Sequence, residues 1–143
     1  MPNLTYHLVA EESLVAVLPS DHRLAGLDEV DPRVLAGETF ITVSKTAPTL
    51  RAIINEFISQ SGLDIHPRLE VDNLAMAMSL IASTRGVALL PAYAKNFLPW
   101  SVISRPLAGD APKVDLVIAY STINTAPTLR LFLSRIASQL CLF

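Results

Sequence analysis

Three consecutive polar residues, Ser44, Lys45 and Thr46, stand where a predicted strand over residues 39–44 gives way to a predicted helix. They supply two hydroxyl groups and one ammonium group at the start of that helix. The amino end of a helix carries backbone N–H groups without partners and a partial positive charge, so it can hold an anion. The alternative is that the hydroxyls only cap the helix and that Lys45 points to solvent. Local sequence alone favours this alternative, because many helix caps serve no ligand.

Side-chain patterns typical of catalytic or metal sites are missing from the sequence. His7, His22 and His66 lack the spacing of metal ligands, and the single cysteine, Cys141, cannot build a zinc site. The dipeptide Asp21-His22 has no G-x-S-x-G nucleophile turn to serve, and it is better explained as a turn whose side chains bond to the backbone. The glycines form neither a P-loop nor a G-x-G-x-x-G turn. The sequence therefore predicts no enzyme, no metal site and no cofactor.

Composition limits the remaining classes of protein. The chain has 143 residues, of which 51% are apolar and 17% charged, so one domain or two small lobes with a packed core is expected. The net charge is −2 and no basic block is present, so binding of nucleic acid by this chain alone is not expected. Cys141 excludes an intramolecular disulfide and is interpreted as a small hydrophobic side chain rather than a reactive thiol. The sequence shows neither a membrane-spanning run nor a signal-peptide pattern, which predicts a cytoplasmic protein without membrane contact.

Strand and helix signals alternate along the chain, which is typical of an α/β fold. Apolar and β-branched runs predict strands at residues 13–19, 39–44, 66–71, 86–91, 102–107 and 113–121. Helical periodicity, capping residues and stop glycines predict helices at residues 47–62, 73–86 and 125–140. Asp31 before Pro32 predicts a capped helical turn that ends at Gly37. The order predicts parallel strands joined by helical crossovers.

The hexapeptide Thr-Ala-Pro-Thr-Leu-Arg occurs twice, at residues 46–51 and 125–130, which are 79 residues apart (125 − 46). Both copies follow a predicted strand and open a predicted helix, where threonine suits the N-cap and proline is tolerated in the first turn. The flanks differ and the offset is not a repeat period, so we interpret the copies as two solutions to one local requirement. The buried face predicted for the last helix comprises Leu129, Phe132, Leu133, Ile136, Ala137 and Leu140.

Six stretches in a fixed order resemble the effector-binding domain of LysR-type transcriptional regulators. These stretches are Leu18-Pro19, Asp21 to Ala25, Leu35 to Gly37, the unit over 39–61, Val71 to Asn73, and Gly86 to Pro91. The resemblance covers nearly all of residues 11–137. One departure is Thr84, which stands where the family often has a glycine and is followed by Arg85, a cation expected near the cleft.

The resemblance implies a periplasmic-binding-protein type II-like α/β fold, with one complete lobe and part of a second. Residues 20–105 would form lobe two, or regulatory subdomain II. Residues 1–19 and 106–143 would form part of lobe one, or regulatory subdomain I. Pro19 and Pro106 are then the predicted hinge between the lobes. The family's helix-turn-helix domain and the first β-α units of lobe one are expected to lie outside this sequence.

The resemblance also implies where a ligand binds, since family members hold a small effector between the two lobes. By position, Ser44, Lys45 and Thr46 match the lobe-two loop that contacts effectors. Pro91 and Ala92 match the end of a strand that lines the same cleft. The resemblance therefore favours the ligand-binding hypothesis for this junction over the capping alternative.

The expected function is effector sensing within a transcriptional regulator. The partners would be a small and anionic effector, DNA only through a helix-turn-helix domain absent from this sequence, and a second copy of the chain, most simply as a dimer. Self-association is expected because an incomplete lobe leaves apolar surface uncovered. A stand-alone solute-binding module and a small α/β enzyme are the alternatives. A helix-turn-helix reading frame just before Met1 would decide for the regulator.

Overall fold

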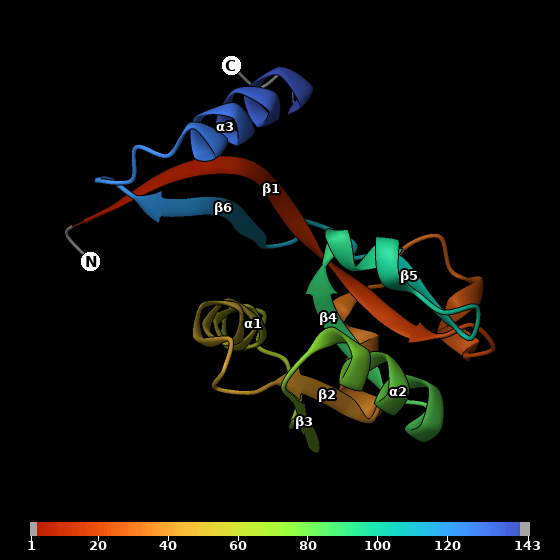
Figure 1. Ribbon diagram of the computed structural model, residues 1–143. Coiled ribbons are helices and arrows are strands. Elements are labelled where there is room, and N and C mark those ends of the chain that lie inside the picture. Colours follow the sequence, from red (N-terminus) through yellow and green to blue (C-terminus); the bar gives the residue numbers. More distant parts are fainter. Residues whose placement is uncertain (1–2, 141–143) are drawn as a thin grey trace. The chain divides into compact units, whose positions relative to one another are not determined.

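The computed structural model describes residues 3–140, with side chains described up to residue 138, so Cys141 lies outside the described residues. The strands are β1 (Leu4–Pro19), β2 (Phe40–Val43), β3 (Leu69–Val71), β4 (Val87–Pro91), β5 (Val102–Pro106) and β6 (Lys113–Ser121). The helices are α1 (Pro48–Gln60), α2 (Leu74–Thr84) and α3 (Pro127–Leu140), with 3-10 turns at Arg23–Gly26, Pro32–Gly37 and Ala92–Phe97. The predicted α/β alternation is confirmed (Figure 1).

The chain divides into two compact units. Unit 1 contains the described residues up to Glu11 and from Asp115 onward, and unit 2 is Glu12–Val114. Strands β1 and β6 each contribute residues to both units. The predicted lobe boundaries lie after residues 19 and 105, and the assignment of these units to lobes stays a prediction.

Unit 2 is built on a mixed sheet with the strand order β3-β2-β4-β1-β5. Strand β2 pairs in parallel with β3 and with β4, as predicted. Strand β1 pairs antiparallel with both β4 and β5, so the prediction of an all-parallel sheet is wrong for this strand. The apolar run Leu14–Leu18 is buried throughout, and a run of this kind suits either direction. The sequence therefore carries no signal for the direction of β1.

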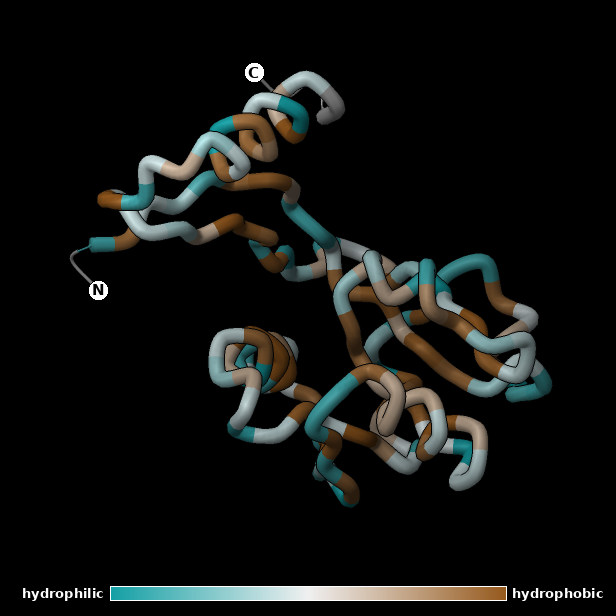
Figure 2. The backbone as a smooth tube through the Cα atoms, viewed as in Figure 1, coloured by the Kyte–Doolittle hydropathy of each residue, from teal (hydrophilic) through white to brown (hydrophobic). Residues whose placement is uncertain are grey.

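The core of unit 2 lies between these strands and the inner faces of two helices. Strands β2 and β4 and the Leu14–Leu18 part of β1 are largely hydrophobic (Figure 2). Helix α1 contributes Ile54 and Ile58, and α2 contributes Ala77, Met78 and Ile81. The buried residues of each helix recur at helical spacing, as a helix with one apolar face requires.

The two helices of unit 2 begin differently. Asn73 caps α2, since its side-chain oxygen accepts a hydrogen bond from the backbone N–H of Met76 at 2.8 Å. Helix α1 begins at Pro48 after Ala47, which offers no side-chain cap. The predicted threonine cap is therefore wrong for Thr46, whose hydroxyl lies against another side chain instead.

The same helices end on residues in the left-handed region. Gly62 follows α1 with a φ of 64°, as the predicted stop requires. Helix α2 is followed by Arg85, with a φ of 57°, so the prediction that Gly86 supplies this stop is wrong. Gly86 meets a packing requirement instead. A Cβ there would lie 2.7 Å from Cδ1 of Ile41 and 3.0 Å from the carbonyl oxygen of Thr39.

Gly86→Ala is expected to lower the free energy of unfolding by about 1–3 kcal/mol, because the new methyl group overpacks the contact with β2. Gly37→Ala is the matched control, since a Cβ at Gly37 meets nothing within 4 Å. The control should change stability by less than about 1 kcal/mol. Urea unfolding followed by far-UV circular dichroism measures both. Equal unfolding midpoints for the two variants would contradict this account of Gly86.

Asp31 begins the turn over Pro32–Gly37, which confirms the predicted cap. Its Oδ1 accepts a hydrogen bond from the backbone N–H of Arg33 at 3.0 Å. The guanidinium of Arg33 also donates to both carboxylate oxygens, with Nη2 2.7 Å from Oδ2. The side-chain hydrogen bonds from Arg33, aided by the backbone hydrogen bond, lower the pKa of Asp31 from 3.8 to about 2.

An NMR titration of the Asp31 carboxyl group should therefore have its midpoint near pH 2. Because the pKa is lower in the folded chain than in the unfolded chain, the stabilisation is present above pH 3.8 and is lost as the pH falls toward about 2. Arg33→Ala should move the midpoint up toward 3.8. A midpoint that is the same in both proteins would show that Arg33 does not lower this pKa.

Unit 1 pairs the first part of β1 with β6 and places α3 beside the two strands (Figure 1). The hydroxyl oxygens of Thr5 and Thr122 lie 2.9 Å apart, and Nε2 of His7 lies 2.9 Å from the hydroxyl of Tyr120. The His7 and Tyr120 rings also stack, with centroids 5.6 Å apart. The prediction of a strand only from residue 13 misses this part of β1, because pairing with β6 forms a strand that its polar residues do not signal.

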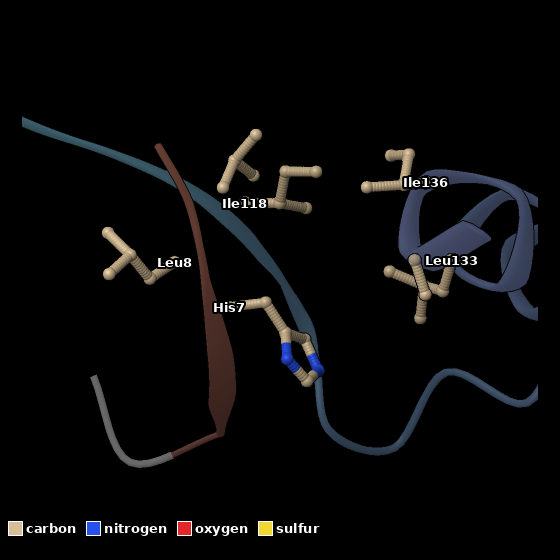
Figure 3. Close-up of a pocket in the computed structure, with 7 residues that line it drawn as sticks. His7, Leu8, Ile118, Leu133 and Ile136 are labelled. Carbon is tan, nitrogen blue, oxygen red and sulfur yellow. The ribbon is translucent and has the colours of Figure 1, made fainter. Parts of the chain in front are cut away.

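Helix α3 turns part of its predicted face toward these strands. Leu133, Ile136 and Ala137 line a cavity of about 150 Å³ together with residues of β1 and β6. Figure 3 shows Leu133 and Ile136 projecting from α3 on the side of the strands. Phe132, which was also expected on the buried face, is 53% exposed, because one step along a helix turns a side chain by about 100°. The side chain of Leu140 lies outside the described part of the chain.

Candidate functional site

Polar residues follow three neighbouring parallel strands of unit 2. Ser44 comes directly after β2, Asp72 and Asn73 come after β3, and Tyr93 comes after β4. Strands β3, β2 and β4 are adjacent and run in the same direction, so these residues meet at one edge of the sheet. Ligands of open α/β sheets bind beyond this carboxyl edge.

A cavity of about 180 Å³ lies at this edge. Its aliphatic wall comes from the strand ends and the first turns of α1 and α2, and is formed chiefly by Val43, Leu50, Val71, Leu74, Ala77 and Leu90. The polar residues of the wall are Asp72, Asn73 and Tyr93. An apolar cavity with a few convergent polar groups is the usual form of a small-molecule site.

Ser44, Thr46 and Asp72 form a hydrogen-bonded cluster at the rim of this cavity. The buried Ser44 hydroxyl donates to Oδ1 of Asp72 at 2.6 Å and accepts from the backbone N–H of Thr46 at 3.2 Å. The Thr46 hydroxyl oxygen lies 2.7 Å from that of Ser44. The backbone N–H of Ser44 also donates to the carbonyl oxygen of Val71 at 2.8 Å. The cluster therefore joins the loop after β2 to the loop after β3.

The amino ends of α1 and α2 both reach the cavity, through Leu50 and Leu74 respectively. The first N–H groups of a helix have no partners inside the helix, and they carry a partial positive charge. This potential offsets the negative charge of Asp72. The site thus combines one carboxylate with two positive helix ends.

The structure places the predicted site residues as follows. Ser44 and Thr46 belong to the cluster, and Lys45 between them is exposed. Pro91 lines the cavity, whereas Ala92 does not and instead opens a 3-10 turn. Four of the five residues thus lie in or beside the site, and their contact with an effector stays a prediction.

The predicted hinge prolines both lie inside unit 2. Pro19 pairs with Val102 and Pro106 pairs with Val15, so both stand in the β1-β5 ladder. The division between the units falls between residues 11 and 12 and between residues 114 and 115. The hinge role of the two prolines stays a prediction.

Arg85, expected as a cation near the cleft, pairs with another residue. Its Nη1 lies 3.0 Å from both carboxylate oxygens of Asp21, on exposed surface, and it does not line the cavity. The hydrogen bond from Arg85 lowers the pKa of Asp21 below its usual value. The neighbouring His22 caps a turn, since its Nδ1 accepts from the backbone N–H of Leu24 at 3.1 Å. The predicted turn with a side chain bonded to the backbone is thus confirmed for His22, whereas the Asp21 carboxylate bonds to the Arg85 side chain instead.

Neither a cluster of metal-binding side chains nor a membrane-spanning helix is found among the described residues. Within residues 3–140, no group of His, Cys, Asp or Glu side chains is placed to hold a metal ion. In the same part of the chain, none of the helices has the length and apolar character needed to cross a membrane.

Asp72, Asn73 and Tyr93 are the polar wall residues that the sequence prediction missed. The signal was available, because the rule that places Ser44 at a carboxyl strand end applies equally to β3 and β4. Asp72 and Asn73 follow the strand over Leu69–Val71 in the same manner. The partnership of Asp72 with Ser44 was not available, since it depends on the pairing of β2 with β3.

The sequence matches the family model described as "LysR substrate binding domain" over residues 1–141. It is 30% identical over 140 residues to the Hca operon transcriptional activator HcaR of Escherichia coli, covering 97% of this chain and 47% of that protein. It is 28% identical over 120 residues to the HTH-type transcriptional regulator AlsR of Bacillus subtilis, covering 83% of this chain and 40% of that protein. The chain spans about half the length of the curated relatives it matches.

Solved structures share the fold. A putative LysR family regulator from Pseudomonas aeruginosa matches with a TM-score of 0.82 at 20% identity, over 99% of this chain and 50% of that one. The BenM effector-binding domain with benzoate matches with a TM-score of 0.78 at 19% identity, over 99% and 65%. The QuiR domain with shikimate matches with a TM-score of 0.77 at 17% identity, over 96% and 66%. These similarities confirm the predicted fold class, and with the match over residues 1–141 they show that the chain belongs to the LysR substrate-binding domain family.

Proposed function

We propose that this chain is the effector-sensing part of a LysR-type transcriptional regulator, with its effector bound where β2, β3 and β4 end. The observation that carries the proposal is the position of the Ser44-Thr46-Asp72 cluster at the rim of a cavity on this edge. HcaR and AlsR are named as transcriptional regulators, and the QuiR and BenM domains were solved with shikimate and benzoate. A small organic molecule is the kind of ligand that these comparisons support.

The proposed mechanism is a shift between conformations. An effector that binds one arrangement of the protein more tightly moves the population toward it, by no more than its difference in affinity for the two. That shift would reach DNA through a helix-turn-helix domain, since this chain has a net charge of −2 and no basic block of its own. We assign the chain binding rather than catalysis, and a place in the cytoplasm, because the relatives are named as regulators of transcription.

We propose an anionic group on the effector. The amino ends of α1 and α2 supply positive potential at the cavity, and the exposed Lys45 adds an ammonium group beside it. Arg85 supplies no support for this, because it pairs with Asp21. The anionic group should therefore lie toward Lys45 and the amino end of α1, because Asp72 stands immediately before the N-cap residue of α2.

We also propose that the chain self-associates, most simply as a dimer. Unit 1 exposes several large apolar side chains on its strands and helix, namely Tyr6, Leu8, Leu116, Val117, Leu131 and Phe132. Clusters of exposed apolar side chains on one small unit mark interaction surfaces. A second copy of the chain would cover them.

Native mass spectrometry of the purified chain tests both parts of the proposal. The expected spectrum shows a dimer that carries one small molecule per chain. Ala77→Leu should remove the small molecule, because Ala77 is buried in the cavity wall and the larger side chain fills the space. Ala82→Leu, at an exposed position of the same helix, is the control and should keep it.

The outcomes are separable. A small molecule that stays bound in folded Ala77→Leu would show that this cavity is not the site. A monomer would show that the self-association is wrong, whatever is bound.

A further inference from the structure

We propose that Thr46 Oγ1 can only accept a hydrogen bond from an effector, because its own proton is used within the protein, and that it selects an effector that presents a hydroxyl group to it. The inference rests on the effector site proposed above and names the class of effector. It follows from the direction of the hydrogen bonds in the Ser44-Thr46-Asp72 cluster. A hydroxyl has a single proton, so fixing where one hydroxyl donates fixes what its neighbour must do.

Asp72 sets the direction. A carboxylate only accepts hydrogen bonds, so Ser44 must be the donor in the 2.6 Å contact between its Oγ and Oδ1 of Asp72. The single proton of the Ser44 hydroxyl is then used. Ser44 Oγ also accepts from the backbone N–H of Thr46 at 3.2 Å, and this contact holds the loop in place.

Thr46 is left with one choice. Its Oγ1 lies 2.7 Å from Ser44 Oγ, which has no proton left to give, so the Thr46 hydroxyl must donate. Toward a ligand, Oγ1 of Thr46 therefore offers only lone pairs and can only accept a hydrogen bond. Thr46 is exposed. Its neighbour in the sequence, Ala47, lines the cavity, and so does Asp72, to which Thr46 is connected by hydrogen bonds through Ser44. Asp72 and Ser44 act here as positioning residues.

The consequence for recognition concerns the group that meets Thr46. A hydroxyl of the effector can donate to Oγ1, whereas an ether or carboxylate oxygen would place lone pairs against lone pairs and leave polar atoms unsatisfied. Sites built to bond a hydroxyl reject analogues that lack it. The anionic end of the effector would lie toward Lys45 and the amino end of α1. The structure therefore favours a small hydroxylated acid.

Matched probe pairs test this inference on the full chain. Each pair joins a hydroxy acid with its O-methyl ether: 3-hydroxybenzoate with 3-methoxybenzoate, and lactate with 2-methoxypropanoate. NMR titration would follow the backbone amides of Thr46, Asn73 and Leu74. For at least one pair, the hydroxy acid should bind about tenfold more tightly than its ether, which is the effect of one hydrogen bond.

Variants connect the preference to the cluster. Thr46→Val removes the hydroxyl with little change of shape and should abolish the preference, while Thr46→Ser should keep it. Thr46 does not cap α1, so neither change removes a helix cap. In Asp72→Asn, the amide group can donate a hydrogen bond to Ser44, which a carboxylate cannot do. Ser44 could then donate to Thr46, and the Thr46 hydroxyl would be free to donate to the effector. The preference should then shrink or invert.

Three results would overturn the inference. Ethers that bind as tightly as hydroxy acids, with shifts at the same amides, would show that Thr46 does not select a donor, and the proposed site would stand. A preference that survives Thr46→Val would show that another group reads the hydroxyl. If no probe perturbs these amides, the proposed site itself is wrong and the inference fails with it.

Discussion

Replacing Phe40 with alanine is expected to lower the free energy of unfolding of unit 2 by about 3–5 kcal/mol. Phe40 is 0% exposed at the start of β2, and its side chain belongs to the hydrophobic core of unit 2. Its backbone carbonyl also accepts the N–H of Arg68 at 3.0 Å, a bond that the substitution leaves in place. The loss therefore reports on packing alone, since the smaller side chain leaves a cavity.

Phe97→Ala is the matched control for Phe40→Ala. Phe97 is 63% exposed, so its replacement should cost less than about 1 kcal/mol. Urea unfolding should be followed by far-UV circular dichroism. The single tryptophan, Trp100, is 93% exposed, so its fluorescence would change little on unfolding. Equal unfolding midpoints for the two phenylalanine variants would show that the core is not organised as described.

The double variant Ser44→Ala, Thr46→Ala is expected to weaken effector binding by about 1–3 kcal/mol, or about 5–150-fold. It removes the hydroxyls that connect the loop after β2 to Asp72, and it leaves the Asp72 carboxylate without its donor at 2.6 Å. Unit 2 should remain folded, because the N-cap residue of α1 is Ala47 rather than Thr46. Calorimetric titration with the molecule found by mass spectrometry measures the change.

Ser79→Ala is the control for this double variant. Ser79 is exposed on α2 and does not line the cavity, so its removal should leave the affinity unchanged. If wild type and the double variant bind the effector with the same affinity, the two hydroxyls do not contribute to effector binding. A loss of helical signal in the double variant would instead assign them to stability.

The elements of unit 2 could be predicted well because their signals are local. Asn73 caps α2 through a hydrogen bond that spans three residues, and Gly62 ends α1 with its own backbone conformation. The first part of β1 could not be predicted, since its contacts with β6, such as that between His7 and Tyr120, join residues 113 apart in the sequence. The direction of β1 was hidden for the same reason. Local chemistry specifies elements, and long-range pairing specifies how they join.

The candidate site was predictable in part for the same physical reason. Ser44 and Thr46 follow a strand and precede a helix, which is visible in the sequence. Asp72 meets Ser44 across 28 residues, and only the parallel pairing of β2 with β3 brings them together. Arg85 was misplaced because Asp21, 64 residues away, takes its charge. Residues that act through a distant partner were therefore the ones that the sequence prediction missed or misplaced.

An NMR map of the bound effector on the isotope-labelled chain tests the proposed position of the effector site most directly. We expect amide shift changes at Ser44 to Ala47, at Asp72 to Leu74 and at Tyr93, around the cavity at the ends of β2, β3 and β4. Changes confined to the cavity in unit 1, lined by His7, Ile118 and Leu133, would show that the effector does not bind at the proposed site.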